Sequence, residues 1–243
     1  MPRNVALIVA AGRGHRVGGP LPKQYRDLAG HPVLSHTIRA FAGHPAIDAV
    51  RTVIHPVDHP LYRVAVSEFE IGLNGKLLTP VSGGDTRQDS VRLGLESLEA
   101  KAPQWVLIHD AARPFVEQAL ISRTLAALDT APGAVPAVAV RDTLKREAEG
   151  RVAETVSREG LWRAQTPQGF CYLEILEAHR RFSGLELTDD AAVAEKAGLG
   201  VALVEGDEDN VKVTTEEDLW RAEALLGAGE VRSGMGFDVH RFG

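Results

Sequence analysis

The segment VALIVAAGRGHR, residues 5–16, decides the fold. Residues 5–10 form a short apolar run that is typical of a buried strand, and the alanine and glycines that follow predict a loop at its carboxyl end. Small residues in such a loop let backbone N–H groups approach an anion closely. The segment therefore indicates a strand that leads into an anion-binding loop, with a plain structural turn and solvated charges as the alternative.

The rest of the chain alternates between short apolar runs and segments with apolar residues at helical spacing. We expect strands at residues 49–54, 77–81, 105–108, 134–140 and 201–204. We expect helices at residues 33–41, 61–69, 89–98, 117–128, 172–182, 190–197 and 215–226. This alternation predicts right-handed crossovers and an α/β fold with a mostly parallel sheet, in one domain over residues 1–226.

One stretch departs from this alternation. Residues 141–146 and 151–158 are polar and extended in pattern, and they flank Glu149-Gly150. Two such segments around a short turn predict a β-hairpin. We therefore expect an extended arm at about residues 141–160 that projects from the main body.

Composition excludes several classes of function. The 243 residues carry a net charge of −6, which disfavours nonspecific binding to nucleic acid. No apolar run approaches 18 residues, and the N-terminus lacks the pattern of a signal peptide, so we expect no membrane partner. A single cysteine, Cys171, cannot form an internal disulfide, which favours a cytoplasmic protein.

Two further polar clusters follow expected strands. The turn GGDTRQDS, residues 83–90, opens a helix, and its N–H groups and hydroxyls could hold a base or a ribose; the alternative is simple capping by Asp89 or Ser90. The cluster HDAARP, residues 109–114, ends a buried strand, the usual place of an active site in an open sheet. Asp110 could hold Mg²⁺ or a substrate hydroxyl there, or form only a surface ion pair with Arg113.

Two familiar phosphate loops do not fit the glycine segment. The dinucleotide fingerprint needs glycine where Val17 stands, and no acidic residue ends the second strand. A Walker A loop needs Gly-Lys-Ser/Thr, whereas Lys23 lies between Pro22 and Gln24. An NAD-dependent oxidoreductase is thus disfavoured, while a non-catalytic nucleotide-binding module stays open as an alternative.

Together the motifs resemble those of the 2-C-methyl-D-erythritol 4-phosphate cytidylyltransferase family. The resemblance covers residues 4–226 and rests on AAGRGHR (10–16), PKQY (22–25), GGDTRQDS (83–90), VLIHDAARP (106–114) and DNVKVT (209–214). It implies a Rossmann-like fold of the nucleotide-diphospho-sugar transferase type. It also implies transfer of CMP from CTP to 2-C-methyl-D-erythritol 4-phosphate in non-mevalonate isoprenoid synthesis, with Mg²⁺ as cofactor. A cytidylyltransferase for ribitol 5-phosphate is the runner-up in the same superfamily.

The resemblance also implies roles for individual residues. Catalytic roles fall on Arg16, Lys23, Arg158 and Lys212. Nucleotide binding falls on Ala10, Ala11, Gly12, Gly14, Gly84, Asp85, Ser90, Asp110 and Ala111. Binding of the polyol phosphate falls on Arg113, Thr143, Arg158, Thr166, Thr188 and Lys212. Thr143 and Arg158 would act in the site of a second subunit, in a homodimer that exchanges arms. Val9 departs from the family pattern, since many members have proline there.

The C-terminal segment, residues 227–243, resembles a linker followed by the opening strand of 2-C-methyl-D-erythritol 2,4-cyclodiphosphate synthase. In that family the Asp-x-His pair, here Asp238 and His240, binds a divalent metal such as Zn²⁺ or Mn²⁺ together with a later histidine. Alternation along a strand places both side chains on one face. The third ligand is missing from this sequence, so we expect a metal site only if the second domain is complete. The resemblance implies the first half of a bifunctional enzyme.

Overall fold

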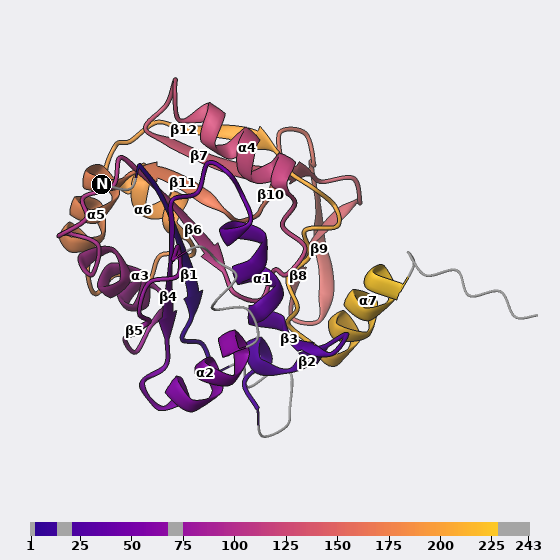
Figure 1. Ribbon diagram of the computed structural model, residues 1–243. Coiled ribbons are helices and arrows are strands. Elements are labelled where there is room, and N and C mark those ends of the chain that lie inside the picture. The colour runs from indigo at the N-terminus through magenta and orange to yellow at the C-terminus, as the bar shows by residue number, and fades with distance from the viewer. Residues whose placement is uncertain (1–2, 14–20, 68–74, 228–243) are drawn as a thin grey trace, which may run out of the picture.

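The computed structural model of the protein describes residues 3–13, 21–67 and 75–227. Gly14, Arg16, Asp238 and His240 lie outside the described residues. Within them, an eight-stranded sheet has the spatial order β10-β7-β11-β6-β1-β4-β5, with β12 beside β7 (Figure 1). Its strands are β1 (Asn4–Ala10), β4 (Ala49–Ile54), β5 (Val81–Ser82), β6 (Trp105–Asp110), β7 (Gly133–Ala139), β10 (Trp162–Ala164), β11 (Gln168–Cys171) and β12 (Val201–Glu205).

Strand β1 lies between β6 and β4 and runs parallel to both. Val9, near its end, is in register with Asp110 of β6 on one side and with Val53 of β4 on the other. The three strands therefore reach the same edge of the sheet together. The chain continues from β1 to β4 on one side and later returns to β6 on the other. Such a switch point is where open α/β sheets bind their ligands.

Helices cover both faces of the sheet. One face packs against α1 (Val33–Ala42), α2 (His59–Ser67) and α4 (Gln118–Ala127). The other face packs against α3 (Arg87–Glu96), α5 (Tyr172–Arg181) and α6 (Asp190–Lys196). Helix α3 approaches the sheet closely, because a Cβ at Gly94 would lie 2.6 Å from Val53 and 2.8 Å from Leu7. Among the helices of the described ranges, none has both the length and the apolar character that crossing a bilayer requires.

The predicted α/β fold with a mostly parallel sheet is confirmed, with two local corrections. The strand expected at residues 77–81 is wrong, because only Val81–Ser82 is a strand and Leu77 makes one isolated bridge to Val50. Pro80 lacks the N–H that a continuous ladder would need at this sheet edge. Strands β10 and β11 were not predicted, and both pair antiparallel within the sheet. They are short, and the side chains of β10 are exposed, so neither shows the apolar run of a buried strand.

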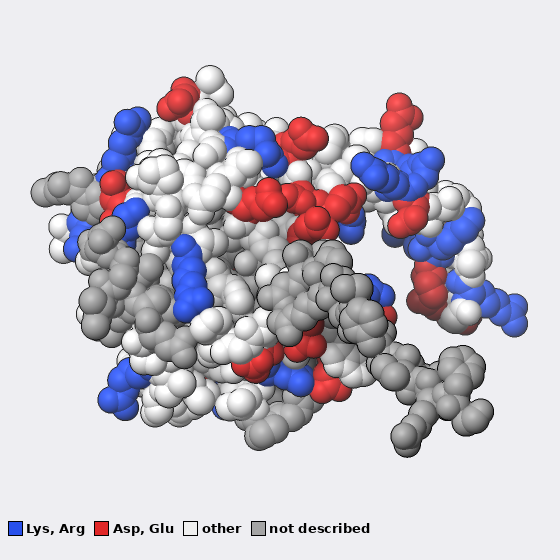
Figure 2. All heavy atoms as spheres, turned by 45° about the vertical axis from the view of Figure 1, so that its right-hand side comes forward, with Lys and Arg blue, Asp and Glu red and all other residues white. Residues whose placement is uncertain are grey.

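The predicted arm is confirmed as a hairpin. Strands β8 (Leu144–Ala148) and β9 (Arg151–Val156) pair antiparallel in a separate two-stranded sheet. Glu149 and Gly150 connect them with φ angles of 53° and 74°, and a two-residue loop with two positive φ angles matches the twist of a hairpin. The arm stands out from the body and carries side chains of both charges (Figure 2).

A small subdomain closes the described chain. Helix α7 (Glu216–Gly227) packs against the hairpin of β2 (Asp27–Leu28) and β3 (His31–Pro32), with Leu28 and Leu219 in a shared apolar cluster. Thr215 and Asp218 form a reciprocal cap, because each side chain accepts a hydrogen bond from the other's backbone N–H. This cap fixes the helix directly after the 209–214 motif, which lies beside the sheet edge described next.

Candidate active site

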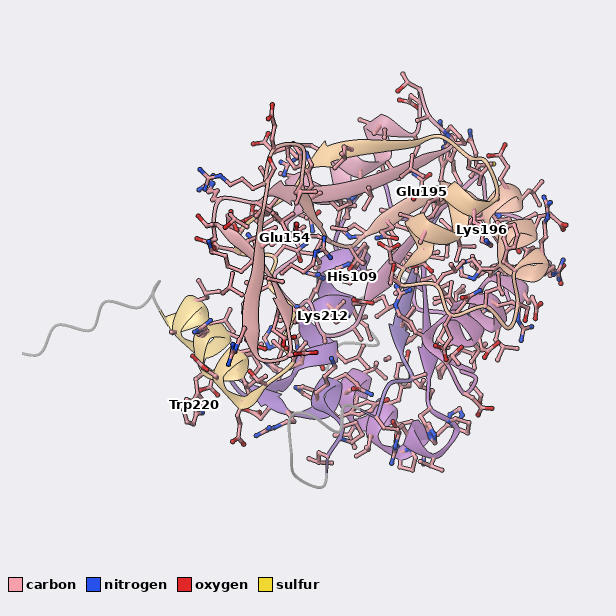
Figure 3. All side chains as sticks on the ribbon, turned by 180° about the vertical axis from the view of Figure 1, so that it is seen from behind. His109, Glu154, Glu195, Lys196, Lys212 and Trp220 are labelled. Atoms are coloured by element: carbon pink, nitrogen blue, oxygen red, sulfur yellow. The ribbon has the colours of Figure 1, made fainter. Side chains whose placement is uncertain are left out.

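A cavity of about 480 Å³ opens at the carboxyl ends of β1, β4 and β6. Its lining includes ten residues for which the sequence predicted a role: Ala10, Ala11, Gly12, Lys23, Gly84, Asp85, Ser90, Asp110, Ala111 and Lys212. Their positions span most of the chain, and the strand order brings them together. Figure 3 shows Lys212 near the middle of the molecule, close to His109, while Trp220 projects from the outer side of α7.

The first wall of the cavity is the segment that follows β1. Gln24, which is 2% exposed, donates its amide hydrogens to the carbonyl oxygens of Ala10 at 2.7 Å and Gly12 at 3.0 Å. Arg13 donates to the buried carboxylate of Asp58 at 2.8 Å. These contacts fix the backbone around Gly12 and place Lys23, the neighbour of Gln24, against the cavity. Sequence reasoning gave Gln24 no role, although it stands inside the PKQY motif.

The second wall is the turn before α3. Thr86 caps the helix by accepting a hydrogen bond from the N–H of Asp89, so the predicted alternative of capping by Asp89 or Ser90 is wrong. The buried Ser90 hydroxyl accepts from the N–H of Gly84 at 3.2 Å and donates to the carbonyl of Thr86 at 2.9 Å. A Cβ at Gly83 would lie 2.6 Å from both Ala11 Cβ and Ser90 Oγ. Close approach of these two walls therefore requires glycine here.

Asp110 contributes a buried carboxylate to the lining of the cavity. Arg87 Nε lies 3.2 Å from Oδ1, and Lys212 Nζ lies 2.6 Å from Oδ2. Burial disfavours the ionised form, but these two cations outweigh it and hold the pKa of Asp110 well below its usual range. The predicted alternative of a surface pair between Asp110 and Arg113 is wrong. Arg113 instead donates to the carbonyl oxygen of Asn210 at 2.6 Å.

A buried chain of hydrogen bonds holds the backbone of Asp110. The Asp110 N–H donates to Thr166 Oγ1 at 3.1 Å, and this hydroxyl lies 3.0 Å from His109 Nδ1. On the other side of the ring, His109 Nε2 lies 3.1 Å from the carbonyl oxygen of Arg113, which can only accept. We therefore assign a neutral ring with its proton on Nε2 and the Thr166 hydroxyl donating to Nδ1. Complete burial agrees, because it lowers the pKa of His109 to about 4.

Lys212 reaches the cavity on a loop that docks against the end of β6. The fully buried Asn210 donates its side-chain amide to the carbonyl of Thr166 at 2.8 Å. The N–H of Val213 donates to the carbonyl of Ala112 at 2.8 Å. These two bonds hold the backbone on both sides of Val211 and Lys212, and the partly exposed Lys212 side chain reaches Asp110.

The charge of the lining is locally positive, although the chain as a whole is acidic. Arg13, Lys23, Arg87 and Lys212 line the cavity together with two carboxylates, those of Asp85 and Asp110. Converging cations and backbone N–H groups favour an anionic ligand with several phosphates.

Comparison with known protein families shows where the chain belongs. A family model described as "IspD: 2-C-methyl-D-erythritol 4-phosphate cytidylyltransferase" matches residues 4–228. The chain belongs to this cytidylyltransferase family.

Individual relatives agree with this assignment. The chain is 62% identical over 243 residues to the "Bifunctional enzyme IspD/IspF" of Paramagnetospirillum magneticum, and 61% identical over 244 residues to the protein of that name from Rhodospirillum rubrum. Each comparison covers 100% of this chain and 62% of the relative, so the chain spans about three fifths of the length of these relatives. The crystal structure of 2-C-methyl-D-erythritol 4-phosphate cytidylyltransferase from Thermus thermophilus has a TM-score of 0.72 and 35% identity, covering 90% of this chain and 97% of that one. The predicted family and fold are confirmed.

Other residues predicted from the cytidylyltransferase motifs lie away from the cavity lining. Thr143 and Arg158 are exposed on the arm or at its base, and Arg158 donates to the carbonyl of Arg141. Thr188 is exposed before α6, and Thr166 is buried with its hydroxyl in the Asp110–His109 chain. Arg113 is half-buried under the 209–214 loop. Their predicted roles in binding the polyol phosphate stay predictions.

The donor set of the cytidylyltransferase cavity fits one kind of metal ion. Within the described ranges, no group of three His, Cys, Asp or Glu side chains could hold a metal. Asp110 nevertheless presents a carboxylate in the cavity. Mg²⁺ is commonly held by one or two carboxylates together with substrate phosphates. The residues present therefore fit a Mg²⁺ that enters with a triphosphate rather than one enclosed by protein ligands alone.

Proposed function

We propose that this chain transfers CMP from CTP to 2-C-methyl-D-erythritol 4-phosphate, giving 4-diphosphocytidyl-2-C-methyl-D-erythritol and pyrophosphate for non-mevalonate isoprenoid synthesis. The observation that carries the proposal is the cavity at the switch point of the sheet, where Lys23 and Lys212 stand with Asp110. Membership of the cytidylyltransferase family supports the choice of substrates. A ribitol 5-phosphate cytidylyltransferase is not favoured by any relative reported above.

The reaction is a displacement at phosphorus. An oxygen of the polyol phosphate forms a bond to the α-phosphorus of CTP while the bond from that phosphorus to the bridging oxygen breaks, and the electron pair leaves with pyrophosphate. The nucleophile is already ionised at neutral pH, so no strong base is required. Both reactants are anions that repel each other. Catalysis therefore depends on positive charge and on in-line alignment.

The proposed roles of the residues follow from this need. The backbone at Ala11 and Gly12, together with Gly14, would hold the triphosphate, and Arg16 and Lys23 would neutralise it. The turn at Gly84, Asp85 and Ser90 would hold the cytidine. Lys212 would exchange its contact with Asp110 for a phosphate oxygen, which frees one oxygen of the carboxylate for a polyol hydroxyl. Arginine supplies a planar fork and lysine a mobile point charge, so the two types suit these different tasks.

Asp110 is also the side chain that would hold part of the Mg²⁺ shell, directly or through water. Mg²⁺ bound there supplies positive charge to the phosphate oxygens. Removal of the metal with a chelator should abolish pyrophosphate release, and added Mg²⁺ should restore it.

We further propose a homodimer with exchange of arms. Thr143 and Arg158 lie away from this chain's own cavity, and Val152 at the arm is 65% exposed, which supports a role for the arm in contact with a second copy. Co-expression of Lys23→Ala and Arg158→Ala subunits tests this, because one intact site forms in each mixed dimer only if the arm crosses over. Random pairing would then restore about a quarter of wild-type activity. No recovery above the two parent variants would contradict the exchange.

The longer relatives suggest a second activity. We propose that the complete protein continues into a cyclodiphosphate synthase domain, in which Asp238 and His240 would bind Zn²⁺ or Mn²⁺. The free, half-buried Cys171 supports a cytoplasmic location. The intact mass of the native polypeptide tests the fusion, and a cellular species that ends at Gly243 would contradict it.

The decisive experiment measures pyrophosphate release with Mg²⁺ while CTP, UTP, ATP and GTP are each combined with methylerythritol phosphate and with ribitol 5-phosphate. We expect turnover with CTP and methylerythritol phosphate. Faster turnover with ribitol phosphate would establish the runner-up, and nucleotide binding without turnover would establish a non-catalytic module.

A further inference from the structure

Arg87 connects the candidate active site to a second, more deeply buried carboxylate. Its Nε lies 3.2 Å from Asp110 Oδ1, and its Nη2 lies 2.7 Å from Asp190 Oδ2. Asp190 is fully buried, and its other oxygen lies 3.3 Å from Nε2 of the equally buried His179. A single guanidinium therefore joins a carboxylate of the cavity lining to one inside the protein.

The Asp190 end of this connection is fixed by its backbone. Asp190 is the first residue of α6, and the Asp189 side chain caps this helix by accepting from the N–H of Ala192 at 2.9 Å. The neighbouring N–H of Ala191 donates to the side-chain oxygen of Gln168 on β11 at 2.8 Å. Asp190 consequently has little freedom to follow Arg87, so Arg87 must adjust to Asp190.

The Asp110 end contrasts with this arrangement. Lys212, whose side chain is partly exposed, contacts the second oxygen of Asp110 and also lines the cavity. A lysine on a flexible stem can turn to a phosphate when substrate arrives. Without another partner, the Asp110 carboxylate would then be free to rotate or to take up a proton. Arg87 would then be the remaining partner of Asp110, because the fixed carboxylate of Asp190 holds the other end of the guanidinium.

We propose that Arg87 is a positioning residue for Asp110 and that Asp190 is the anchor of Arg87. The inference rests on the proposed function and deepens it, because it explains how one oxygen of Asp110 stays oriented while the other is given to the substrate. The guanidinium suits this role because two of its nitrogens reach two carboxylates at once, which a single ammonium group cannot do in the same geometry.

A double-mutant cycle tests the first half of the proposal. Pyrophosphate release is measured for wild type, Arg87→Met, Asp110→Asn and the double variant, with both substrates varied. If Arg87 acts through Asp110, Arg87→Met should lower kcat by about tenfold or more in the wild-type background and by less than about twofold in the Asp110→Asn background. Equal losses in both backgrounds would overturn the proposal, since Arg87 would then act on substrate directly or on the fold alone.

Arg92→Met is the matched control. Arg92 lies on the same helix and also contacts two carboxylates, those of Asp89 at 3.5 Å and Glu96 at 3.2 Å, but it does not line the cavity. We expect its kcat to stay within about twofold of wild type. A loss equal to that of Arg87→Met would show that any arginine removed from α3 damages the enzyme, which would overturn the specific role.

Asp190→Asn tests whether Asp190 anchors Arg87, because it removes the charge of the side chain while nearly keeping its shape. It should lower kcat by severalfold when Arg87 is present and should have no further effect in the Arg87→Met background. Additive losses would overturn the anchoring. If Arg87→Met fails to fold, Arg87→Lys replaces it in every cycle, and we expect it to retain the fold while showing the same coupling to Asp110 and to Asp190.

Turnover measurements on the wild-type enzyme distinguish a failure of this inference from a failure of the proposed function. If it prefers another polyol phosphate, the proposed substrate is wrong, and the same double-mutant cycles are measured with the preferred substrate. Should it turn over no polyol phosphate, both proposals fall. Unfolding by urea provides a readout that does not depend on turnover: the unfolding free energies should be non-additive for Arg87→Met with Asp110→Asn, and additivity would contradict the contact itself.

Discussion

Lys212 Nζ lies 2.6 Å from a carboxylate oxygen of Asp110, although 102 positions separate the two residues in the chain. The contact joins the 209–214 motif to the end of β6. It is supported by two bonds of the motif, from Asn210 to the carbonyl of Thr166 before β11 and from Val213 to the carbonyl of Ala112 after β6. In the proposed reaction, the contact gives the lysine a partner before an anionic substrate replaces the carboxylate. Lys212 is thus held close to the cavity before substrate binds. Its side chain therefore loses little conformational freedom when substrate arrives.

Removal of the Lys212 cation should lower kcat more than it weakens substrate binding. Lys212→Ala takes away a charge that the proposed transition state needs, so we expect kcat to fall by on the order of 10²-fold, the usual scale for losing such a contact. Lys23→Ala and Arg16→Ala should show losses of the same order. Steady-state pyrophosphate release measures all three. Lys196→Ala, an exposed lysine on α6 away from the cavity (Figure 3), should match wild type. Near-wild-type kcat in the three variants would contradict the proposed mechanism.

A methyl group at residue 83 should separate the two walls of the cavity. In Gly83→Ala the added Cβ would lie 2.6 Å from both Ala11 Cβ and Ser90 Oγ, and Ala11 can move away only if the backbone after β1 shifts. We expect a loss of about 1–3 kcal/mol in unfolding free energy, typical of overpacking, and a higher KM for CTP. Urea unfolding and substrate titration measure the two effects. Gly200→Ala is the matched control, because a Cβ there meets no atom within 4 Å. Equal behaviour of the two variants would show that the walls do not need to meet.

Loss of the Arg13 anchor should weaken nucleotide binding. Asp58→Asn keeps the shape of the buried side chain and removes the charge that holds Arg13 beside the cavity. We expect KM for CTP to rise severalfold, with a smaller change in kcat. The backbone that follows β1 is held by the Arg13–Asp58 ion pair and by the hydrogen bonds of Gln24, and this variant weakens the first of these. Glu217→Gln serves as control, since it removes a carboxylate that pairs with Arg221 on the exposed surface of α7. A KM for CTP equal to that of the control variant would rule out the anchor.

The sequence predicted the order of the main elements and most residues of the cavity lining, because both depend on local signals. The apolar run of β1 and the glycines after it are contiguous, and so are the motifs at Gly84 and Asp110. The partners of these residues could not be predicted in the same way. Arg87 lies inside a quoted motif, but its contact with Asp190 crosses 103 positions, and no local pattern marks such a pair.

The antiparallel strands β10 and β11 show a second limit of sequence reasoning. Gln168 and Gly169 of β11 do not form an apolar run, because this strand is stabilised by neighbours on both sides rather than by its own pattern. The buried Thr166 precedes β11, and its contact with His109 depends on that pairing. The neutral histidine beside Asp110 in the candidate active site therefore became evident only from the fold.

His109 should make the protein less stable as the pH falls from about 6.5 towards 4. The folded protein keeps the ring neutral because burial lowers its pKa to about 4, whereas the unfolded chain takes up a proton near the ordinary value of 6.5. The unfolded state therefore binds more protons in this window, and the unfolding free energy decreases with falling pH, by about 3 kcal/mol in total for this one group. The window ends above the range in which Asp110 is protonated, because the pKa of that carboxyl is held below its usual value.

Urea unfolding of wild type and His109→Gln at several pH values between 7 and 4.5 tests this expectation. The variant should be less stable at pH 7, because it disturbs the contacts with Thr166 and the Arg113 carbonyl, but its stability should depend less on pH. Burial also lowers the pKa of His36 and His44, and their contribution is common to both proteins, so the difference between the two curves isolates His109. His59→Gln, an exposed histidine, should keep the wild-type slope. Parallel curves for wild type and His109→Gln would mean that the ring beneath Asp110 is not held neutral, and the assigned direction of the Thr166 hydrogen bond would then be wrong.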